Sequence, residues 1–223
     1  MVDVGLIETM RARDGRLPWL ERHLARMRAS ATALGLAHPP VDIADLARIA
    51  AGPGERVVRL ELRDGLVEIS TRDGTEPGSV ALMVSDEAYR PYPHKSTRRE
   101  QFGRSLANAR RLGVDDALLV TAEGYVAEGT AWSLFWWDNG AGGGGEGLFT
   151  PAEELGILPG IGRSRIMELA GVHEARKPVS DLAGRSMFLV NAVRGVVEIG
   201  SFQGQPAPSD PRTAELSSAF WPD

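Results

Sequence analysis

A short proline- and tyrosine-rich stretch, residues 86–94, constrains the fold of this chain more than any other feature. Its sequence, DEAYRPYPH, carries two prolines and two tyrosines and is typical of a connection between two halves. The whole chain has 223 residues, a length that suits one large domain or two small ones. We therefore predict a small α+β domain over residues 1–88 and a larger C-terminal domain over residues 93–223.

The first part predicts one strand, two helices and three further strands. A weakly alternating strand over 3–13 ends at the turn signal Asp14-Gly15. Apolar residues then recur at steps of three and four, which predicts a helix over 20–34 that Gly35 ends. The remaining predictions are a helix over 42–51 and strands over 57–62, 66–71 and 79–85.

The second part predicts mainly strands. A helix over about 98–112 precedes two or three strands that end near Trp137, with turns at Glu123-Gly124 and Gly129. The glycine run 141–147 lies between two strands and is predicted to be a hairpin tip. Further predictions are a helix opening near Gly160, a strand–turn–strand unit over 187–200 and a short last helix.

Composition excludes several function classes. The chain has no cysteine, which excludes disulfides, thiol catalysis and Fe–S clusters, and its mixed net charge of −5 argues against nucleic acid. No apolar run is long enough to cross a membrane and no signal peptide is visible, so we expect a soluble, cytoplasmic protein. We predict no metal site, because no metal-ligand spacing links His23, His38, His94 and His173.

Lysine chemistry is restricted to two positions, Lys95 and Lys177. Lys95 follows the proline-rich connection and precedes a predicted helix. A crowded lysine loses its proton readily, which suits a Schiff-base amine, and Arg98 and Arg99 favour that loss if they face it. The alternative is a solvated loop lysine. Lys177, next to Pro178, is predicted to be a surface lysine.

Three further signals are weak when taken singly. Glu128 ends a strand and either faces a cofactor nitrogen or keeps an edge strand soluble. The sequence from Gly160 to Gly162 opens a helix and either binds an anion or is a plain turn. Arg26 lies beside the apolar stripe of the first helix and either reaches a phosphate or stays on the surface.

The order of these signals resembles the class IV aminotransferase family, the fold-type IV enzymes that use pyridoxal 5'-phosphate (PLP). The resemblance covers nearly the whole chain. It rests on LIETMRARDGRLPWLERHLARMRASATALG, PHKSTRR, ALLVTAEGYVAEGTAWSLFWW, LFTP, GILPGIGRSRI and MFLVNAVRGVVEI. It implies a two-domain α+β and α/β architecture like that of D-amino-acid aminotransferase, with PLP between the domains of a homodimer.

The resemblance also implies roles for individual residues. Lys95 would form the Schiff base with PLP, and Glu128 would pair with its pyridine nitrogen. The phosphate would be bound by Arg26, by backbone amides at Ile161 and Gly162, and by the turn at Asn191 and Ala192. Val193 and Arg194 would lie near a substrate carboxylate, Thr9 is a candidate catalytic residue, and Arg59 or Arg11 is a candidate for the substrate carboxylates.

Within the family, the sequence is most similar to 4-amino-4-deoxychorismate lyase. Thr9 and the turn NAVRG both resemble the lyases more than the branched-chain enzymes. The lyase would convert 4-amino-4-deoxychorismate to 4-aminobenzoate and pyruvate on the path to folate, with a functional link to an aminodeoxychorismate synthase. The alternatives are a branched-chain or D-amino-acid type aminotransferase and a non-catalytic PLP-binding protein.

The sequence departs from the family pattern at four places. The usual stretch before the first strand is missing, which predicts a trimmed first domain. Ser133 replaces a usual asparagine, Phe102 lies where a tyrosine is frequent, and Ala192 lacks a hydroxyl that some members direct at the phosphate. We expect these departures to affect the choice of substrate more than the cofactor.

Overall fold

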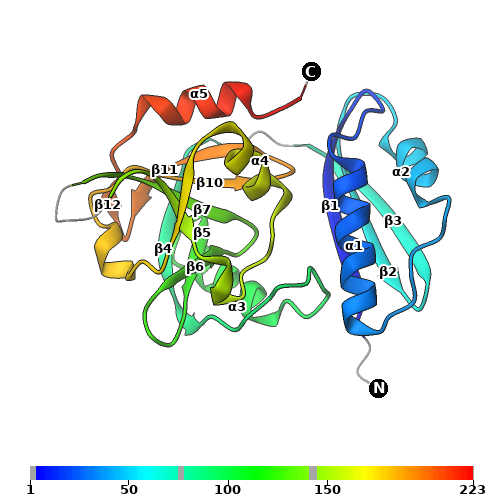
Figure 1. Ribbon diagram of the computed structural model, residues 1–223, viewed down its shortest axis with the longest axis horizontal. Helices are drawn as coiled ribbons and strands as arrows, with labels where there is room; N and C mark the ends of the chain where they lie inside the picture. Colours follow the sequence, from blue (N-terminus) through cyan, green and yellow to red (C-terminus); the bar gives the residue numbers. More distant parts are fainter. Residues whose placement is uncertain (1–3, 75–77, 141–144, 223) are drawn as a thin grey trace. The chain divides into compact units, whose positions relative to one another are not determined.

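The computed structural model describes residues 4–74, 78–140 and 145–222 and divides into two compact units (Figure 1). The first unit contains Met1–Glu76 together with His94–Arg99. The second contains Pro77–Pro93 and Glu100–Asp223. Lys95 therefore belongs to the first unit, although the chain on both sides of its segment belongs to the second.

These bounds differ from the division at 88 and 93 that the sequence predicts. The strand β4 (Val80–Ala88) falls within the predicted first domain, but it pairs in parallel with β5 (Asp116–Val120) and β11 (Gly195–Phe202) of the second unit. The local sequence of a strand shows its alternation but not its pairing partners. The boundary consequently falls before β4.

The first unit is a three-stranded antiparallel sheet covered on one face by two helices (Figure 1). The sheet order is β1-β2-β3. The β2–β3 turn places Asp64 (φ 48°) and Gly65 (φ 77°) in the left-handed region, as a tight hairpin of this kind requires. The bounds are β1 Leu6–Arg13, α1 Leu20–Leu34, α2 Ile43–Ala51, β2 Glu55–Arg63 and β3 Leu66–Asp73.

Helix α1 confirms the predicted range 20–34. Its apolar side chains at steps of three and four are buried against the sheet, as Leu24 and Met27 show. Gly35 ends the helix in a left-handed conformation (φ 64°), and its N–H donates to the carbonyls of Ala31 and Thr32. The apolar stripe therefore fixes which side chains of α1 face β1.

The second unit is a nine-stranded mixed sheet with the order β6-β5-β4-β11-β10-β7-β8-β9, and β12 pairs with β11. Helix α3 packs against β4 and β5, α4 against β10, and α5 against β11. The remaining bounds are α3 Glu100–Arg111, β6 Val126–Gly129, β7 Ser133–Asn139, β8 Glu146–Pro151, the 3-10 helix η1 Glu153–Leu155, α4 Ile161–Leu169, β9 Val172–Ala175, the 3-10 helix η2 Val179–Leu182, β10 Met187–Asn191, β12 Gln205–Pro206 and α5 Pro211–Ala219.

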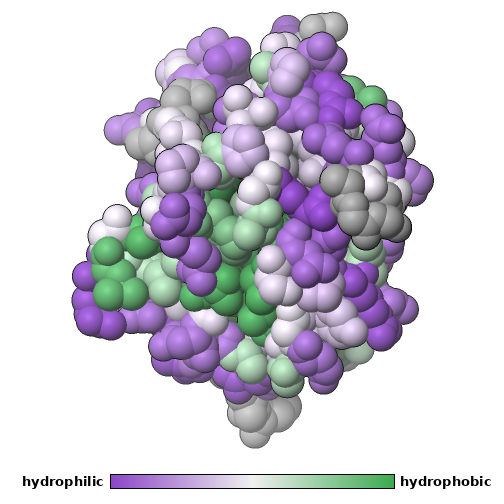
Figure 2. Space-filling view, turned by 90° about the vertical axis from the view of Figure 1, so that its left-hand side faces the viewer, coloured by the Kyte–Doolittle hydropathy of each residue, from purple (hydrophilic) through white to green (hydrophobic). Residues whose placement is uncertain are grey.

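The strand β7, between β10 and β8, is buried at every position except its last. Its indole and phenyl rings make much of the core, where Phe135 stacks on Phe188 at 5.1 Å and Trp136 stacks on Phe149 at 6.0 Å. The face in Figure 2 is mainly polar, and its apolar side chains gather in one area. β7 and β8 flank the predicted glycine hairpin tip, of which residues 141–144 lie outside the described part of the chain.

Candidate active site

Lys95 lies in a short segment that adds to the edge of β1 in the first unit. The Ile7 N–H donates to the Lys95 carbonyl at 2.8 Å, and the Thr97 N–H donates to the Gly5 carbonyl at 2.9 Å. A Cβ at position 5 would lie 2.8 Å from the Leu62 carbonyl oxygen, so only glycine permits this packing. Lys95 is half-buried and its main chain is held by the sheet, unlike a solvated loop lysine.

A buried carboxylate, Glu8, joins β1 to two side chains of α1. Glu8 is 1% exposed and points to the helix side of the sheet. The Arg26 guanidinium donates to it twice, from Nε to Oε1 at 2.9 Å and from Nη2 to Oε2 at 2.6 Å. The ring atom Nδ1 of His23 lies 2.6 Å from Glu8 Oε2. Arg26 is thus part of a buried cluster and not a surface arginine.

The environment fixes the charges in this cluster. Burial raises the pKa of Glu8, but Arg26 and His23 outweigh it and hold this pKa at about 2. Burial lowers the pKa of His23 despite the adjacent carboxylate, and the charges of Arg26 and Lys95 lower it further. At neutral pH, Glu8 is therefore ionised and His23 is neutral.

These protonation states assign the tautomer of His23. An ionised carboxylate only accepts hydrogen bonds, so the proton of His23 lies on Nδ1 and is donated to Glu8. The other ring nitrogen, Nε2, is then an acceptor. It is buried and has no hydrogen-bond partner within the described part of the chain.

Thr9 and the two candidate substrate arginines share the opposite face of the same sheet. Thr9 lies directly across from Arg59 in the β1–β2 pairing, and Arg11 follows two residues after Thr9. Both arginines already have carboxylate partners, because Arg11 contacts Glu55 at 2.8 Å and Arg59 contacts Glu61 at 2.8 Å. Either arginine would have to share or exchange its partner to bind a substrate carboxylate.

Glu128 ends β6 in the second unit and is buried. Its Oε1 accepts a hydrogen bond from the Tyr89 hydroxyl at 2.7 Å and a longer one from the Leu158 N–H at 3.4 Å. Burial and the Glu128 charge raise the pKa of Tyr89, so the phenol stays protonated and donates. Glu128 is accordingly not a solubility residue of an edge strand.

The chain that follows Glu128 is held by Asp116. This buried carboxylate accepts from the backbone N–H groups of Ala117 at 2.7 Å and Thr130 at 3.1 Å, and from Trp132 Nε1 at 2.9 Å. Burial raises its pKa in spite of these donors. Asp116 therefore connects β5 to the turn between β6 and β7.

The N-terminus of α4 meets the turn after β10 at a place that we name the α4–β10 junction, made of residues 160–162 and 191–192. A Cβ at Gly162 would lie 3.0 Å from the backbone C and Cα atoms of Asn191, so the two backbones touch. The Asn191 side chain accepts from the Val193 and Arg194 N–H groups at 2.9 and 2.8 Å. The junction gathers a helix N-terminus and a tight turn, which favours an anion.

The predicted phosphate residues of the second unit are thus brought together. Ile161 is buried in the first turn of α4, and Ala192 is half-buried beside Asn191. Val193 and Arg194 lie in the same turn, and the Arg194 guanidinium is 5.5 Å from the centre of the Trp132 ring. This contact orients a cation next to the junction.

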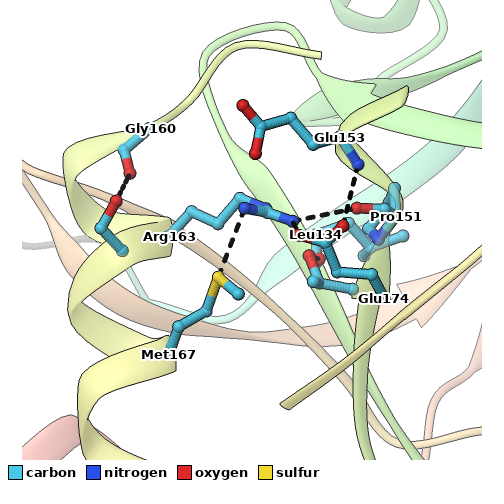
Figure 3. A network of polar contacts seen from close by, with 9 residues as sticks. Leu134, Pro151, Glu153, Gly160, Arg163, Met167 and Glu174 are labelled. Atoms are coloured by element: carbon cyan, nitrogen blue, oxygen red, sulfur yellow. Dashed lines mark hydrogen bonds and ion pairs between the residues drawn. The ribbon is translucent and has the colours of Figure 1, made fainter. Parts of the chain in front are cut away.

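Arg163 lies in the first turn of α4, and its guanidinium is held by contacts with β8 and β9 (Figure 3). It is 4% exposed, forms an ion pair with Glu174 of β9 and donates to the Pro151 carbonyl at 3.3 Å. Its Nη1 also lies 3.3 Å from the Met167 sulfur. These contacts attach α4 to β8 and β9 and so fix where the helix begins.

The structure shows the surroundings of two residues that depart from the family pattern, Phe102 and Ser133. Phe102 lies in the core of the second unit, with its ring centre 4.9 Å from that of Tyr92. Ser133 lies against the α4–β10 junction, because a Cβ at Gly160 would be 2.9 Å from its Oγ. The small side chain at 133 therefore leaves room for the backbone at 160.

The prediction that Lys177 is a surface lysine is wrong. Its Nζ lies 3.4 Å from Oδ2 of Asp138, and its side chain is 17% exposed. Asp138 is itself buried and also pairs with Arg185. The sequence around Lys177 gives no sign of Asp138, which lies 39 residues away along the chain.

No group of three or more His, Asp or Glu side chains in residues 4–74, 78–140 and 145–222 is arranged to hold a metal ion. None of the helices in these ranges combines the length and the apolar character that crossing a membrane requires.

A family model for amino-transferase class IV matches residues 5–202. The chain belongs to the class IV aminotransferase family. This family of PLP-dependent enzymes includes the protein, and the match covers both units of the fold. The predicted family and fold class are thereby confirmed.

Three individual proteins that the chain resembles share 21–24% of its residues. The chain is 24% identical to the bifunctional aminodeoxychorismate lyase / D-amino acid transaminase of Mycobacterium tuberculosis, over 93% of this chain and 84% of that protein. The branched-chain aminotransferase of Thermoproteus uzoniensis has a similar fold, with a TM-score of 0.87 and 21% identity over 97% of this chain and 84% of that one. The PLP-bound form of a hypothetical aminotransferase of M. tuberculosis gives a TM-score of 0.81 and 23% identity over 97% and 88%.

Sequence reasoning missed Glu8, His23 and Tyr89. The signal for Glu8 was its place in the alternation of β1, at an inward position between Leu6 and Met10. His23 lies beside Leu24 on the apolar stripe and three residues from Arg26, so a polar pair facing the core was readable there. Tyr89 gave no such signal, because its partner is distant in the sequence.

Proposed function

We propose that this member of the class IV aminotransferase family binds PLP and acts as a lyase on 4-amino-4-deoxychorismate, releasing 4-aminobenzoate and pyruvate. The observation that supports the cofactor is the α4–β10 junction, a backbone anion site in which Gly162 touches Asn191. The substrate is supported by the name of the M. tuberculosis relative, which states both a lyase and a transaminase activity.

The residues of both units fit PLP by the chemistry of their donors. The first unit offers an amine at Lys95 and a guanidinium at Arg26, and the second offers a buried carboxylate at Glu128 and the α4–β10 junction. An amine, a phosphate site and an acceptor for a pyridinium N–H are the three groups that PLP needs. The donor set is complete without a metal ion.

Each residue has a proposed task. PLP, when bound, supplies an electron sink for the bonds at the substrate amine carbon. Lys95 would hold PLP through its side-chain amine, and the same amine would move a proton at the substrate as a general base. Glu128 keeps the pyridine nitrogen protonated, and Tyr89 holds Glu128 in place.

The phosphate and substrate sites complete the proposal. Arg26, the amides of Ile161 and Gly162, and the turn at Asn191 and Ala192 bind the phosphate. Val193 and Arg194 lie next to this place and take part in binding a substrate carboxylate, and Thr9 with Arg11 or Arg59 offers donors for the rest of the substrate. Loss of pyruvate is driven by formation of the aromatic ring.

The alternative function is a PLP-dependent aminotransferase that acts on an amino acid and a 2-oxo acid. It uses the same residues, and the name of the bifunctional relative supports it equally. The two functions differ in what happens after the substrate amine has replaced Lys95. A third alternative, a non-catalytic PLP-binding protein, would bind the cofactor and turn over neither substrate.

The first test concerns the cofactor. The purified protein mixed with PLP should show the visible absorption band of a lysine–pyridoxal Schiff base, and Lys95→Ala should abolish it. Lys177→Ala is the matched control, because this chain has two lysines and Lys177 pairs with Asp138 in the second unit. A band that survives in Lys95→Ala, or is absent from the parent at excess PLP, contradicts the proposal.

The second test separates the reactions. The lyase releases pyruvate from 4-amino-4-deoxychorismate without any 2-oxo acid acceptor, and coupled lactate dehydrogenase detects it. An aminotransferase instead converts PLP to the pyridoxamine form on addition of an amino acid and stops there. The proposed link to an aminodeoxychorismate synthase is a prediction that pull-down of the two purified proteins would address.

A further inference from the structure

We propose that Glu8 is a positioning residue, which holds the Arg26 guanidinium in the orientation that binds the cofactor phosphate. This inference rests on the proposed PLP function. No part of the reaction is assigned to Glu8 itself, because it is buried under α1 and acts through Arg26. Glu8 instead determines where the positive charge of Arg26 is placed.

The first observation is the two-point contact between the side chains. Two parallel hydrogen bonds, Nε to Oε1 at 2.9 Å and Nη2 to Oε2 at 2.6 Å, fix the plane of the guanidinium as well as its position. An arginine side chain held at one point keeps several rotamers. With two points occupied, Arg26 has one orientation before any anion arrives.

The second observation is that Glu8 is itself held from another side. His23 donates from Nδ1 to Glu8 Oε2, and both side chains are 1% exposed. The carboxylate is thus held between the β1 backbone, one histidine and one arginine. The buried acceptor Nε2 of His23 has no partner among the described residues, so the ring is not held by a bond on its far side.

The third observation is the charge arrangement around the cluster. Lys95 acts on His23 electrostatically, so the Schiff-base lysine lies in the same field as Glu8 and Arg26. The single negative charge of Glu8 offsets the positive charges of Arg26 and Lys95. Holding two cations near one anion keeps Arg26 in place and still leaves a net positive charge for a phosphate.

The test compares PLP with pyridoxal, which lacks the phosphate. Apoprotein is titrated with each compound, and the dissociation constants are measured from the visible absorption of the bound form. Pre-organisation raises affinity by removing the ordering of the side chain from the binding step. We expect Glu8→Gln to lower the affinity for PLP about tenfold and the affinity for pyridoxal less than about twofold. The preference for the compound that carries the phosphate should therefore fall.

A purely structural role would lower both affinities together or lower only the melting temperature. Adding Glu8→Gln to Arg26→Gln should leave the dissociation constant for PLP unchanged, because Glu8 affects phosphate binding only through Arg26. Asp45→Asn is the matched control, because Asp45 forms an exposed ion pair with Arg48 in the same unit. It should change neither constant.

The outcomes separate the two proposals. A parent protein that binds no PLP overturns the proposed function, whereas a parent that prefers PLP while Glu8→Gln keeps that preference overturns the role of Glu8 alone. If Glu8→Gln does not fold, Glu8→Asp retains the charge with a shorter reach and is measured in the same way. An unchanged preference in that variant contradicts the inference equally.

Discussion

Glu8 shows how one residue can combine a stability penalty with a precise contact. A carboxylate on the helix side of a strand loses its hydration, and two side chains of α1, His23 and Arg26, compensate for that loss. Removing either donor would leave a buried charge without a full set of partners. The cluster therefore makes the packing of α1 on β1 dependent on pH.

The pKa of Glu8 predicts the sign and the range of this dependence. The pKa is about 2 in the folded protein and 4.5 ordinarily, so its contribution is present above pH 4.5 and is lost as the pH falls toward 2. A difference of this size corresponds to about 3 kcal/mol. Between pH 6 and pH 2, the free energy of unfolding measured with urea should fall by about 3 kcal/mol more for the parent than for Glu8→Gln. Parallel curves for the two proteins would contradict the assigned pKa.

Arg163 offers a second test with single residues. Glu174→Ala should lower the free energy of unfolding by about 1–3 kcal/mol, because it leaves a buried guanidinium without its carboxylate. Glu154→Ala is the control, since its ion pair with Arg176 is exposed on both sides and its loss should cost much less stability. Urea denaturation of the apoprotein measures both. Equal losses would show that burial of Arg163 does not strengthen the contact.

At the scale of elements, the N-terminus of α4 lies in backbone contact with the turn after β10. Gly162→Ala places a methyl group 3.0 Å from the Asn191 backbone, so the helix and the turn must move apart. We expect the affinity for PLP to fall about tenfold, measured by titration of the apoprotein. A variant with unchanged affinity would show that the α4–β10 junction is not the phosphate site.

Gly103→Ala provides the matched control in another helix. Gly103 lies in α3, and a Cβ there would meet nothing within 4 Å. Because alanine favours a helix interior over glycine, this variant should leave PLP affinity unchanged and raise stability by about 0.5–1 kcal/mol. Thermal unfolding of the apoprotein would show the difference.

Most elements could be predicted from the sequence, whereas their partners could not. The range 20–34 was predictable because a helix leaves its period and its glycine stop in the local sequence. The place of β4 was not, because β11 lies more than 100 residues further along the chain. The same limit applies to the site: Lys95 and Glu128 are predicted as site residues by resemblance, while the contact of Glu8 with Arg26 depends on how β1 meets α1.

At the scale of the whole molecule, the resemblance predicts a homodimer. Sedimentation velocity of the purified protein should give twice the chain mass of 24.0 kDa at micromolar concentration. Dilution into the nanomolar range, with and without PLP, would show whether the cofactor favours the assembled form. A single species at the monomer mass in both conditions would contradict the prediction.

The route of the chain between the two units has a consequence for protein synthesis. The first unit includes His94–Arg99, so a growing polypeptide cannot complete it until residue 99 has left the ribosome. By then β4 has already been made, and it waits for β5 and for β11, which ends at Phe202. Nearly the whole chain must therefore be translated before that strand has both its neighbours. An unpaired apolar strand is prone to aggregate, so slower translation should lengthen this vulnerable period for the nascent chain.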